Sequence, residues 1–301
     1  MTRNDRLIES RPTQNAWGPL VQVALEQRYA PDHRIIDDPL AYRLLPAYLK
    51  LMVAVGGSSL LRGHLLGLMD RKVPGIVGGI LCRKRAIEER LYQAMGQVVE
   101  CVVDLGAGMD TRAARQPPDS TVIFYEVDLP ETIAAKAAAL RRVYGEIPPQ
   151  IRLVATDLER DDIAGGLAAA GYIPGRKVFF IMEGVTQYIS EAAVRRLLEE
   201  TSGVDPGSGL AFTYIRQDFI EGRELWGLET LYHLTRERRT TWKFGLEPDA
   251  VSEFIAPFGW RKVGQLGSAE YLERYVRPAG RDMPVMAVEQ LVFAEKVSYG
   301  S

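Results

Sequence analysis

The sequence predicts an α/β fold in which a helical region precedes a mostly parallel sheet of seven strands with an antiparallel last strand. After the helical region come five strand-like apolar runs, at 101–105, 121–127, 151–156, 178–182 and 209–215. Helical segments alternate with them, at 130–144, 161–170 and 191–201. Such alternation is typical of parallel strands that are joined by helices. Two more runs, 261–265 and 285–297, are separated by only a short helix and a loop, so we expect the final strand to be antiparallel.

Composition bounds the class of protein. With 47% hydrophobic and 25% charged residues, the 301-residue chain is typical of globular proteins. A net charge of −2 gives no basic surface for nucleic acid or an anionic membrane. Cys82 and Cys101 lie among apolar residues, which favours reduced thiols. No secretory signal or membrane-spanning run is evident, so we expect a cytoplasmic protein.

Residues 1–96 are expected to form a helical lid over the substrate, and residues 97–301 the main domain, with a helical insertion at about 216–243. One lid helix is expected to begin at Asp38 and to end or kink at Pro46. Gly75, Gly78 and Gly79 are expected to form a flexible joint before the last lid helix.

A glycine turn follows the first strand, in the stretch Asp104-Leu105-Gly106-Ala107-Gly108. Glycines allow a sharp turn and let a ligand approach the main chain. Three later strands end in the segments Glu126-Val127-Asp128, Thr156-Asp157-Leu158 and Glu183-Gly184. Because ligands of open parallel sheets bind at the carboxyl ends of the strands, these segments predict a ligand site at one edge.

The turn favours one nucleoside cofactor over another. Asp128 comes 22 positions after Gly106, a spacing typical of an acid that binds a ribose in either NAD or S-adenosylmethionine. A dinucleotide motif would have a third glycine where this chain has Thr111. Asp110 would repel a pyrophosphate but suits a cationic sulfonium. S-adenosylmethionine is therefore favoured, and a nicotinamide-dependent oxidoreductase is the weaker alternative.

Together these motifs resemble the leucine carboxyl methyltransferase family. The matching segments are 104–112, 126–130 with Lys136, 156–158 and 183–184 with Tyr188. The resemblance extends from the Asp-Pro element at 37–41 to the segments 242–245 and 258–260. It implies a Rossmann-like methyltransferase fold. The family includes enzymes that methylate the C-terminal carboxylate of a phosphatase subunit, and bacterial relatives that O-methylate polyketides and other small acids or phenols.

The resemblance also implies how S-adenosylmethionine is bound. The glycine turn would pass under the cofactor, Asp128 would bind its ribose hydroxyls, and Glu183 would lie near its methionine part. Leu129 and Gly184 are also expected to belong to the cofactor site. Ala107 belongs to the glycine turn, and Asp157 and Leu158 would flank the adenine. Either Arg83 or Arg85 would hold the carboxylate of the cofactor, with Arg83 preferred. Asp104 either contacts the ligand or holds the glycine turn by hydrogen bonds.

Departures from the family pattern favour a small-molecule acceptor. The phosphatase-directed enzymes have Glu-Cys and an apolar run where this chain has 183–188, and a basic pair where it has Gln27-Arg28. We therefore expect an O-methyltransferase that acts on a carboxylate or phenolic hydroxyl of a small molecule such as a polyketide. A protein C-terminus as acceptor and a non-catalytic S-adenosylmethionine-binding module remain alternatives.

The catalytic group is left open. A carboxylate acceptor is ionised at pH 7 and needs no general base. A phenol would benefit from one, and the candidates are Tyr188, His233 and Tyr214. Because no histidines or acids recur at the spacing of metal ligands, we expect no metal.

Overall fold

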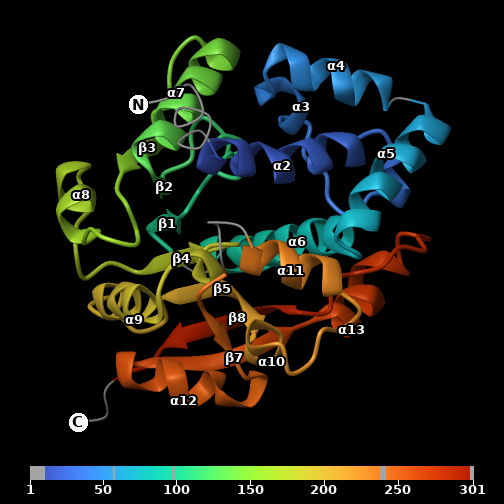
Figure 1. Cartoon of the computed structure of the whole chain (residues 1–301). Coiled ribbons are helices and arrows are strands. Elements are labelled where there is room, and N and C mark those ends of the chain that lie inside the picture. Colours follow the sequence, from blue (N-terminus) through green and yellow to red (C-terminus); the bar gives the residue numbers. More distant parts are fainter. Residues whose placement is uncertain (1–10, 57, 97–98, 238–241, 299–301) are drawn as a thin grey trace, which may run out of the picture.

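One twisted sheet organises the computed structural model, which describes residues 11–56, 58–96, 99–237 and 242–298 (Figure 1). Its strand order is β3-β2-β1-β4-β5-β8-β7, and the two-residue β6 pairs with β5. The bounds are β1 Cys101–Leu105, β2 Ile123–Asp128, β3 Ile151–Ala155, β4 Val178–Met182, β5 Gly209–Arg216, β6 Gly245–Leu246, β7 Trp260–Leu266 and β8 Glu289–Lys296. Strands β1 to β5 run parallel to one another, and β8 is antiparallel to β5 and β7. The predicted sheet is confirmed.

Helices surround this sheet. Those before it are α2 Arg11–Glu26, α3 Ala41–Leu44, α4 Ala47–Val55, α5 Ser59–Lys72 and α6 Ile76–Met95. Those within and after it are α7 Pro130–Tyr144, α8 Ala164–Ala169, α9 Glu191–Glu200, α10 Gln217–Glu221, α11 Glu229–Glu237, α12 Val251–Ile255 and α13 Ser268–Tyr271. Asp38 accepts hydrogen bonds from the N–H groups of Leu40 and Ala41, and Pro46 separates α3 from α4. Both features agree with the predicted start and interruption of this segment.

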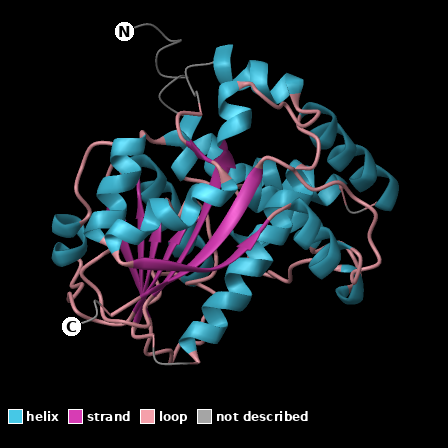
Figure 2. Cartoon of the chain, turned by 90° about the horizontal axis from the view of Figure 1, so that it is seen from below, coloured by secondary structure: helices cyan, strands magenta, loops and turns pink. Residues whose placement is uncertain are grey.

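Alternate strand residues face two different helical layers, and Figure 2 shows helices on both sides of the strands. Val102 and Phe179 belong to an apolar cluster with residues of α2, α6 and α7. Their neighbours Val103 and Phe180 belong to a second cluster with residues of α8, α9 and α12. Because one cluster joins α2 and α6 to the sheet, the N-terminal helices share a core with the rest of the chain.

The predicted glycine joint is wrong. Gly75 precedes α6 in a left-handed conformation, whereas Gly78 and Gly79 are buried inside the helix. A Cβ on Gly78 would lie 2.3 Å from the carbonyl oxygen of Pro284. The N–H of Met286 also donates to the oxygen of Gly75 at 2.9 Å. These glycines therefore allow the chain that leads into β8 to pack directly against α6.

Two further observations concern the whole chain. Cys82 and Cys101 are free thiols and are buried, as predicted, and burial raises the pKa of each to about 12. None of the helices within the described ranges has the length and apolar character needed to cross a bilayer.

Candidate active site

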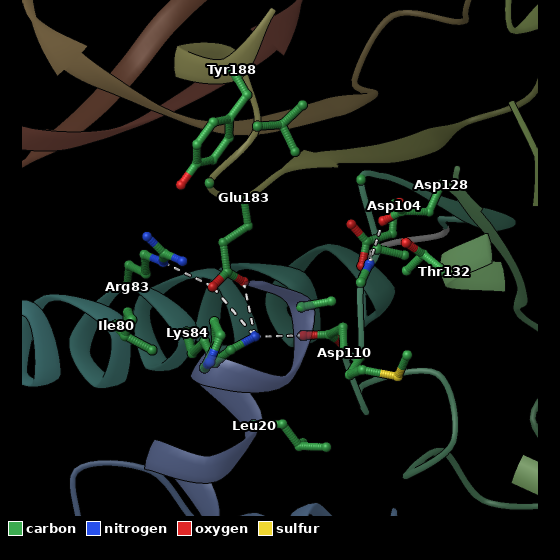
Figure 3. A pocket seen from close by; sticks show the side chains of 18 of the residues that line it. Leu20, Ile80, Arg83, Lys84, Asp104, Asp110, Asp128, Thr132, Glu183 and Tyr188 are labelled. Atoms are coloured by element: carbon green, nitrogen blue, oxygen red, sulfur yellow. Dashed lines mark hydrogen bonds and ion pairs between the residues drawn. The ribbon is translucent and has the colours of Figure 1, made fainter. Parts of the chain in front are cut away.

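A cavity of about 640 Å³ lies where β1, β2, β3 and β4 end. Figure 3 shows part of its wall. The predicted site residues that line it are Arg83, Asp104, Gly106, Ala107, Gly108, Asp128, Leu129, Asp157, Leu158, Glu183, Gly184 and Tyr188. The structure therefore brings together side chains from four strand ends and from α6. This is the edge of the sheet at which the sequence predicts a ligand.

The glycine turn is tightly enclosed. Gly106 has a φ of +82°, and a Cβ there would lie 2.2 Å from Cγ2 of Val185. Its N–H and that of Ala107 both donate to the oxygen of Val127, at 2.8 and 3.1 Å. A side chain at position 106 would be strained by this backbone conformation and would also collide with Val185. Glycine is therefore required to hold the end of β1 against the end of β2.

Asp128 connects the turn to the start of α7. One carboxylate oxygen accepts from the N–H of Gly108 and the other from the N–H of Leu129, both at 2.7 Å. Burial raises the pKa of this carboxyl, and these backbone hydrogen bonds oppose the shift. Each carboxylate oxygen can accept a further hydrogen bond. Asp128 is thus fixed in place and can still accept hydroxyl groups of a ligand.

Asp157 and Leu158 line the cavity at the end of β3. Leu158 is buried there, and Asp157 accepts from the N–H of Glu159 at 2.9 Å. The methyl and methylene groups of Leu158 offer an apolar surface for a flat ring. Both residues follow β3, the strand next to β2, which ends at Asp128. This position agrees with the contact to adenine that the family resemblance implies, and the adenine contact remains a proposal.

Glu183 lies at the centre of an ionic network (Figure 3). Its carboxylate contacts Nε of Arg83 at 3.0 Å, Nη2 of Arg112 at 2.7 Å and Nζ of Lys84 at 3.4 Å. Burial opposes ionisation, but the three cations lower the pKa of Glu183 to about 2. Lys84 and Arg112 also each contact Asp110 at 2.9 Å. Glu183 is therefore an anion whose charge is already balanced by protein.

Gly184 leaves room for this network. Its φ is +69°, and a Cβ there would lie 3.0 Å from Nη2 of Arg83. Asp104 lies in the same wall, where burial and the nearby charge of Asp110 raise its pKa well above the usual value. Whether Asp104 contacts the ligand or holds the glycine turn by hydrogen bonds stays a prediction.

Three predicted residues lie outside the cavity wall. Arg85 pairs with Glu89 at 2.6 Å on the partly exposed side of α6. Tyr214 is fully buried under the sheet, where its hydroxyl accepts from Gln265. His233 is exposed on α11. Of the three base candidates only Tyr188 lines the cavity.

Sequence reasoning missed several lining residues. Lys84 lies between the two predicted arginines and Arg112 ends the matching segment 104–112, and both positions were available signals. Glu289 begins β8, and its Oε1 accepts from Nη1 of Arg83 at 2.5 Å. Glu289 is one of two acids within the mostly apolar run 285–297, and an acid at the start of such a run was the available signal.

Parts of the predicted lid contribute unequally. Apolar residues of α2 and α6 line the cavity: Pro19, Leu20, Val23, Ile76 and Ile80. Within the described part of the insertion, Trp242 contributes to the wall. The residues 238–241 of the predicted insertion lie outside the described ranges. No side chain of α4 or α5 that the structure describes appears in the wall.

Comparison with known proteins agrees with these features. The model of the leucine carboxyl methyltransferase family matches residues 16–202. A Mycobacterium bovis protein named as an S-adenosyl-L-methionine-dependent methyltransferase is 32% identical over 215 residues, which cover 68% of this chain and 66% of that protein. A Frankia alni protein with the same description is 34% identical over 143 residues, covering 47% of this chain and 50% of its own length. The chain thus spans about two thirds or less of these relatives.

A solved structure supports the fold. A protein from Thermobifida fusca, described as a methyltransferase, superposes with a TM-score of 0.55 and 16% identity, covering 81% of this chain and 90% of its own. At this identity the likeness concerns the fold alone. The family match, which includes all four strand ends of the cavity, goes further. The chain belongs to the leucine carboxyl methyltransferase family.

Proposed function

We propose that this chain is an S-adenosylmethionine-dependent O-methyltransferase that acts on a carboxylate or phenolic hydroxyl of a small molecule, such as a polyketide or another natural product. The observation that carries the proposal is the charge of the cavity wall. Its acids are Asp38, Asp104, Asp110, Asp128, Asp157, Glu159, Glu183 and Glu289. Its bases are Arg83, Lys84, Arg112 and Arg115.

Each of these four bases already contacts an acid. The cavity therefore carries an excess of negative charge, and a ligand with positive charge is favoured over an anionic dinucleotide. S-adenosylmethionine carries a sulfonium and an ammonium group. Its charge thus matches the wall better than the pyrophosphate of a nicotinamide cofactor does.

The residues present also fit the shape of this cofactor. The turn from Gly106 to Gly108 lines the cavity, and Asp128 retains hydrogen-bond acceptors for ribose hydroxyls. Arg83 would hold the cofactor carboxylate, for which a guanidinium is suited. When bound, the cofactor supplies a methyl group that is activated by attachment to a positively charged sulfur.

The work of the protein would be to bind, align and exclude water. An acceptor oxygen has to be held in line with the bond that breaks, because alignment of reactants removes much of the barrier. Leu20 and Val23 of α2 and Ile80 of α6 form an apolar wall that would keep water from the reacting groups. No metal is required for this chemistry, and the absence of a metal stays a prediction.

Calorimetry tests the cofactor assignment. The wild-type chain is expected to bind S-adenosylmethionine and S-adenosylhomocysteine, and Asp128→Ala to bind them about tenfold or more weakly, because a hydrogen bond to a charged group is lost. Asp119→Ala, at an exposed acid outside the wall, is the control. Thermal unfolding of each variant shows whether it is folded. Lack of binding by the wild type, or equal binding by Asp128→Ala, would contradict the proposal.

A second experiment separates the alternatives for the acceptor. Labelled S-adenosylmethionine is incubated with the chain and either a set of aromatic acids and phenols or peptides that end in leucine. Transfer to small molecules supports the proposal, and transfer to peptides alone supports a protein C-terminus as acceptor. Tight cofactor binding without transfer to any acceptor would favour a non-catalytic binding module.

A further inference from the structure

A second cavity, of about 210 Å³, lies between α3, α4 and α7. Its wall is formed by Arg43 of α3, Lys50 of α4, and Arg142 and Val143 of α7. Figure 1 shows these three helices together on one side of the molecule, and α3 packs against α7. Thr132 is the last residue of α7 in the wall of the candidate active site, and Arg142 comes ten positions later. At 1.5 Å of rise per residue, the two cavities are about 15 Å apart along this helix.

Every charged side chain in the wall of this second cavity is a cation. Within the described ranges, no acid forms an ion pair with Arg43, Lys50 or Arg142. By contrast, each base of the candidate active site contacts an acid. The overall charge of −2 predicts no such site, because it averages the charges over the whole chain. The fold thus brings together three positive charges and pairs them with none of the described acids.

Arg142 is fixed at the ends of two helices. Its Nη2 donates to the carbonyl oxygens of Leu44 and Leu45, where α3 ends. Arg142 also lies in the last turn of α7. The C-terminus of a helix carries partial negative charge, so both positions suit a guanidinium. The main chain therefore holds Arg142 in place without the help of a ligand.

Arg43 and Lys50 are held by aromatic rings instead. Cζ of Arg43 lies 5.8 Å from the centre of the Tyr144 ring, and Nζ of Lys50 lies 5.8 Å from that of Tyr42. Such contacts position a cation but do not neutralise its charge. Burial and the charges of Arg142 and Arg43 lower the pKa of Lys50, because each of them disfavours its ammonium form. An anion in the cavity would relieve this repulsion.

The size of the cavity and the types of donor indicate the class of anion. Pockets that hold whole drug-sized ligands have volumes of about 300–1,000 Å³, so this smaller cavity suits a single anionic group. Guanidinium groups match the oxygens of a phosphate with pairs of N–H donors, and an ammonium binds phosphate as a compact charge. A phosphate monoester offers three oxygens and close to two negative charges at pH 7. A carboxylate offers two oxygens and one charge, and would balance less of the positive charge.

We propose that the cavity between α3, α4 and α7 binds the phosphate group of a ligand, at a site separate from the candidate active site. Arg43, Lys50 and Arg142 donate hydrogen bonds to the phosphate oxygens. Arg43 and Arg142 are exposed, so the group enters from solvent. A soluble phosphate ester and a lipid headgroup share this chemistry. The site does not depend on the methyl transfer proposed above.

Calorimetry with two small probes tests the site. Glycerol 3-phosphate and glycerate differ in their anionic group and are each titrated into the full chain at constant ionic strength, since salt screens exposed charges. The wild type is expected to bind glycerol 3-phosphate with a Kd of about 1 mM or below. Glycerate should bind at least about tenfold more weakly, because it makes fewer hydrogen bonds to charged groups.

Lys50→Gln is the main variant. It removes one charge from the wall and should weaken binding of glycerol 3-phosphate about tenfold or more. Arg141→Gln is the matched control, because Arg141 is an exposed neighbour of Arg142 outside the wall and its loss changes the net charge equally. This control should change the affinity less than about twofold. Thermal unfolding shows whether each variant is folded. If Lys50→Gln does not fold, Arg43→Gln, at an exposed position, replaces it.

A vesicle experiment distinguishes the two sources of the phosphate. The full chain is sedimented with phosphatidylcholine vesicles that contain or lack phosphatidic acid. Sedimentation that requires both phosphatidic acid and Lys50 supports the proposal and assigns the phosphate to a lipid. Binding of glycerol 3-phosphate without such sedimentation supports it and assigns the phosphate to a soluble ester. The proposal is overturned if the wild type binds neither, if glycerate binds as tightly as glycerol 3-phosphate, or if Lys50→Gln and Arg141→Gln weaken binding equally.

Discussion

The two ends of the cavity differ in how the chain builds them. At the glycine turn, the N–H of Gly108 meets Asp128, only 20 residues later in the sequence. At the β8 end, Arg83 meets Glu289 across a separation of 206 residues. The first end is assembled by neighbouring elements of one βαβ unit, and the second depends on the packing of α6 against the chain before β8. A local motif therefore identifies the glycine-turn end, whereas the β8 end exists only in the folded protein.

The largest effect is expected from Gly106→Ala, at the local end. The new Cβ would adopt an unfavourable φ and overlap Cγ2 of Val185 at 2.2 Å, so the end of β1 has to move. Affinity for S-adenosylhomocysteine should fall about a hundredfold or more, equivalent to about 3 kcal/mol. Calorimetry measures the affinity, and thermal unfolding reports on the fold.

Gly207→Ala separates the two causes. Gly207 has a similar φ of +85°, but a Cβ there has no atom within 4 Å. This variant should lose about 1 kcal/mol of stability from the backbone conformation and keep its cofactor affinity. Similar affinities for the two variants would show that the contact between positions 106 and 185 has no part in binding.

Glu183→Gln should affect both ends, because Glu183 lies between them. Removing its charge leaves Arg83, Lys84 and Arg112 with fewer partners, and loss of one member of a buried ion pair costs about 3–5 kcal/mol. Denaturant unfolding at pH 7 measures this loss. A loss below about 1 kcal/mol would contradict the described network.

The same variant has an expected pH dependence. The folded pKa of Glu183 is about 2, below its ordinary value of 4.5, so its ionised form stabilises the fold. This contribution is complete above about pH 4.5 and is lost as the pH falls toward 2. The difference in unfolding free energy between wild type and Glu183→Gln should therefore shrink over this interval. A constant difference would indicate that Glu183 titrates normally.

Arg83→Lys and Arg85→Lys compare two arginines of one helix. Arg83 contacts Glu183 and Glu289 in the cavity wall, whereas Arg85 contacts Glu89 outside it. Lysine cannot replace the forked contacts of a guanidinium, so Arg83→Lys should weaken S-adenosylhomocysteine binding about tenfold. Arg85→Lys should change it less than about twofold. Equal effects in the two calorimetric titrations would contradict the placement of Arg83 at the cofactor.

The smallest effect on the cofactor is expected from Ile80→Val, at the apolar wall of α6. Removal of one methylene from this buried side chain costs about 1 kcal/mol of stability. Affinity for S-adenosylhomocysteine should stay within about twofold of wild type, because Ile80 lies beside Arg83 and away from Asp128 (Figure 3). A large loss of cofactor affinity in calorimetry would show that the cofactor extends to Ile80.

The difference between local and long-range contacts also explains which elements could be predicted from the sequence. The bounds of β1, β4 and α7 agree with the predicted ranges, because each is an apolar or capped segment with local signals. Arg83 and Arg85 could not be separated by pattern alone. Two residues apart on a helix lie about 200° around its axis, so they face different sides, and the choice depends on what α6 packs against.

Residues defined by tertiary contacts were harder to predict. Pro284 lies so close to Gly78 that a Cβ at position 78 would collide with it. The two residues are 206 positions apart in the sequence, so no local pattern encodes this contact. Tyr214 lies on the strand face that α12 covers rather than at the strand end. Glu289 is one of two acids in the run 285–297, and its partner Arg83 is known only once β8 is placed beside β5.

The most direct test of the account is a crystal structure of the chain with S-adenosylhomocysteine. The account predicts ribose hydroxyls within hydrogen-bond distance of Asp128 and the adenine beside Leu158. It also predicts the sulfur near Glu183, directed toward the β8 end of the cavity where Glu289 lies. A nucleoside bound at the β8 end, or outside the cavity, would contradict the assignment of the two ends.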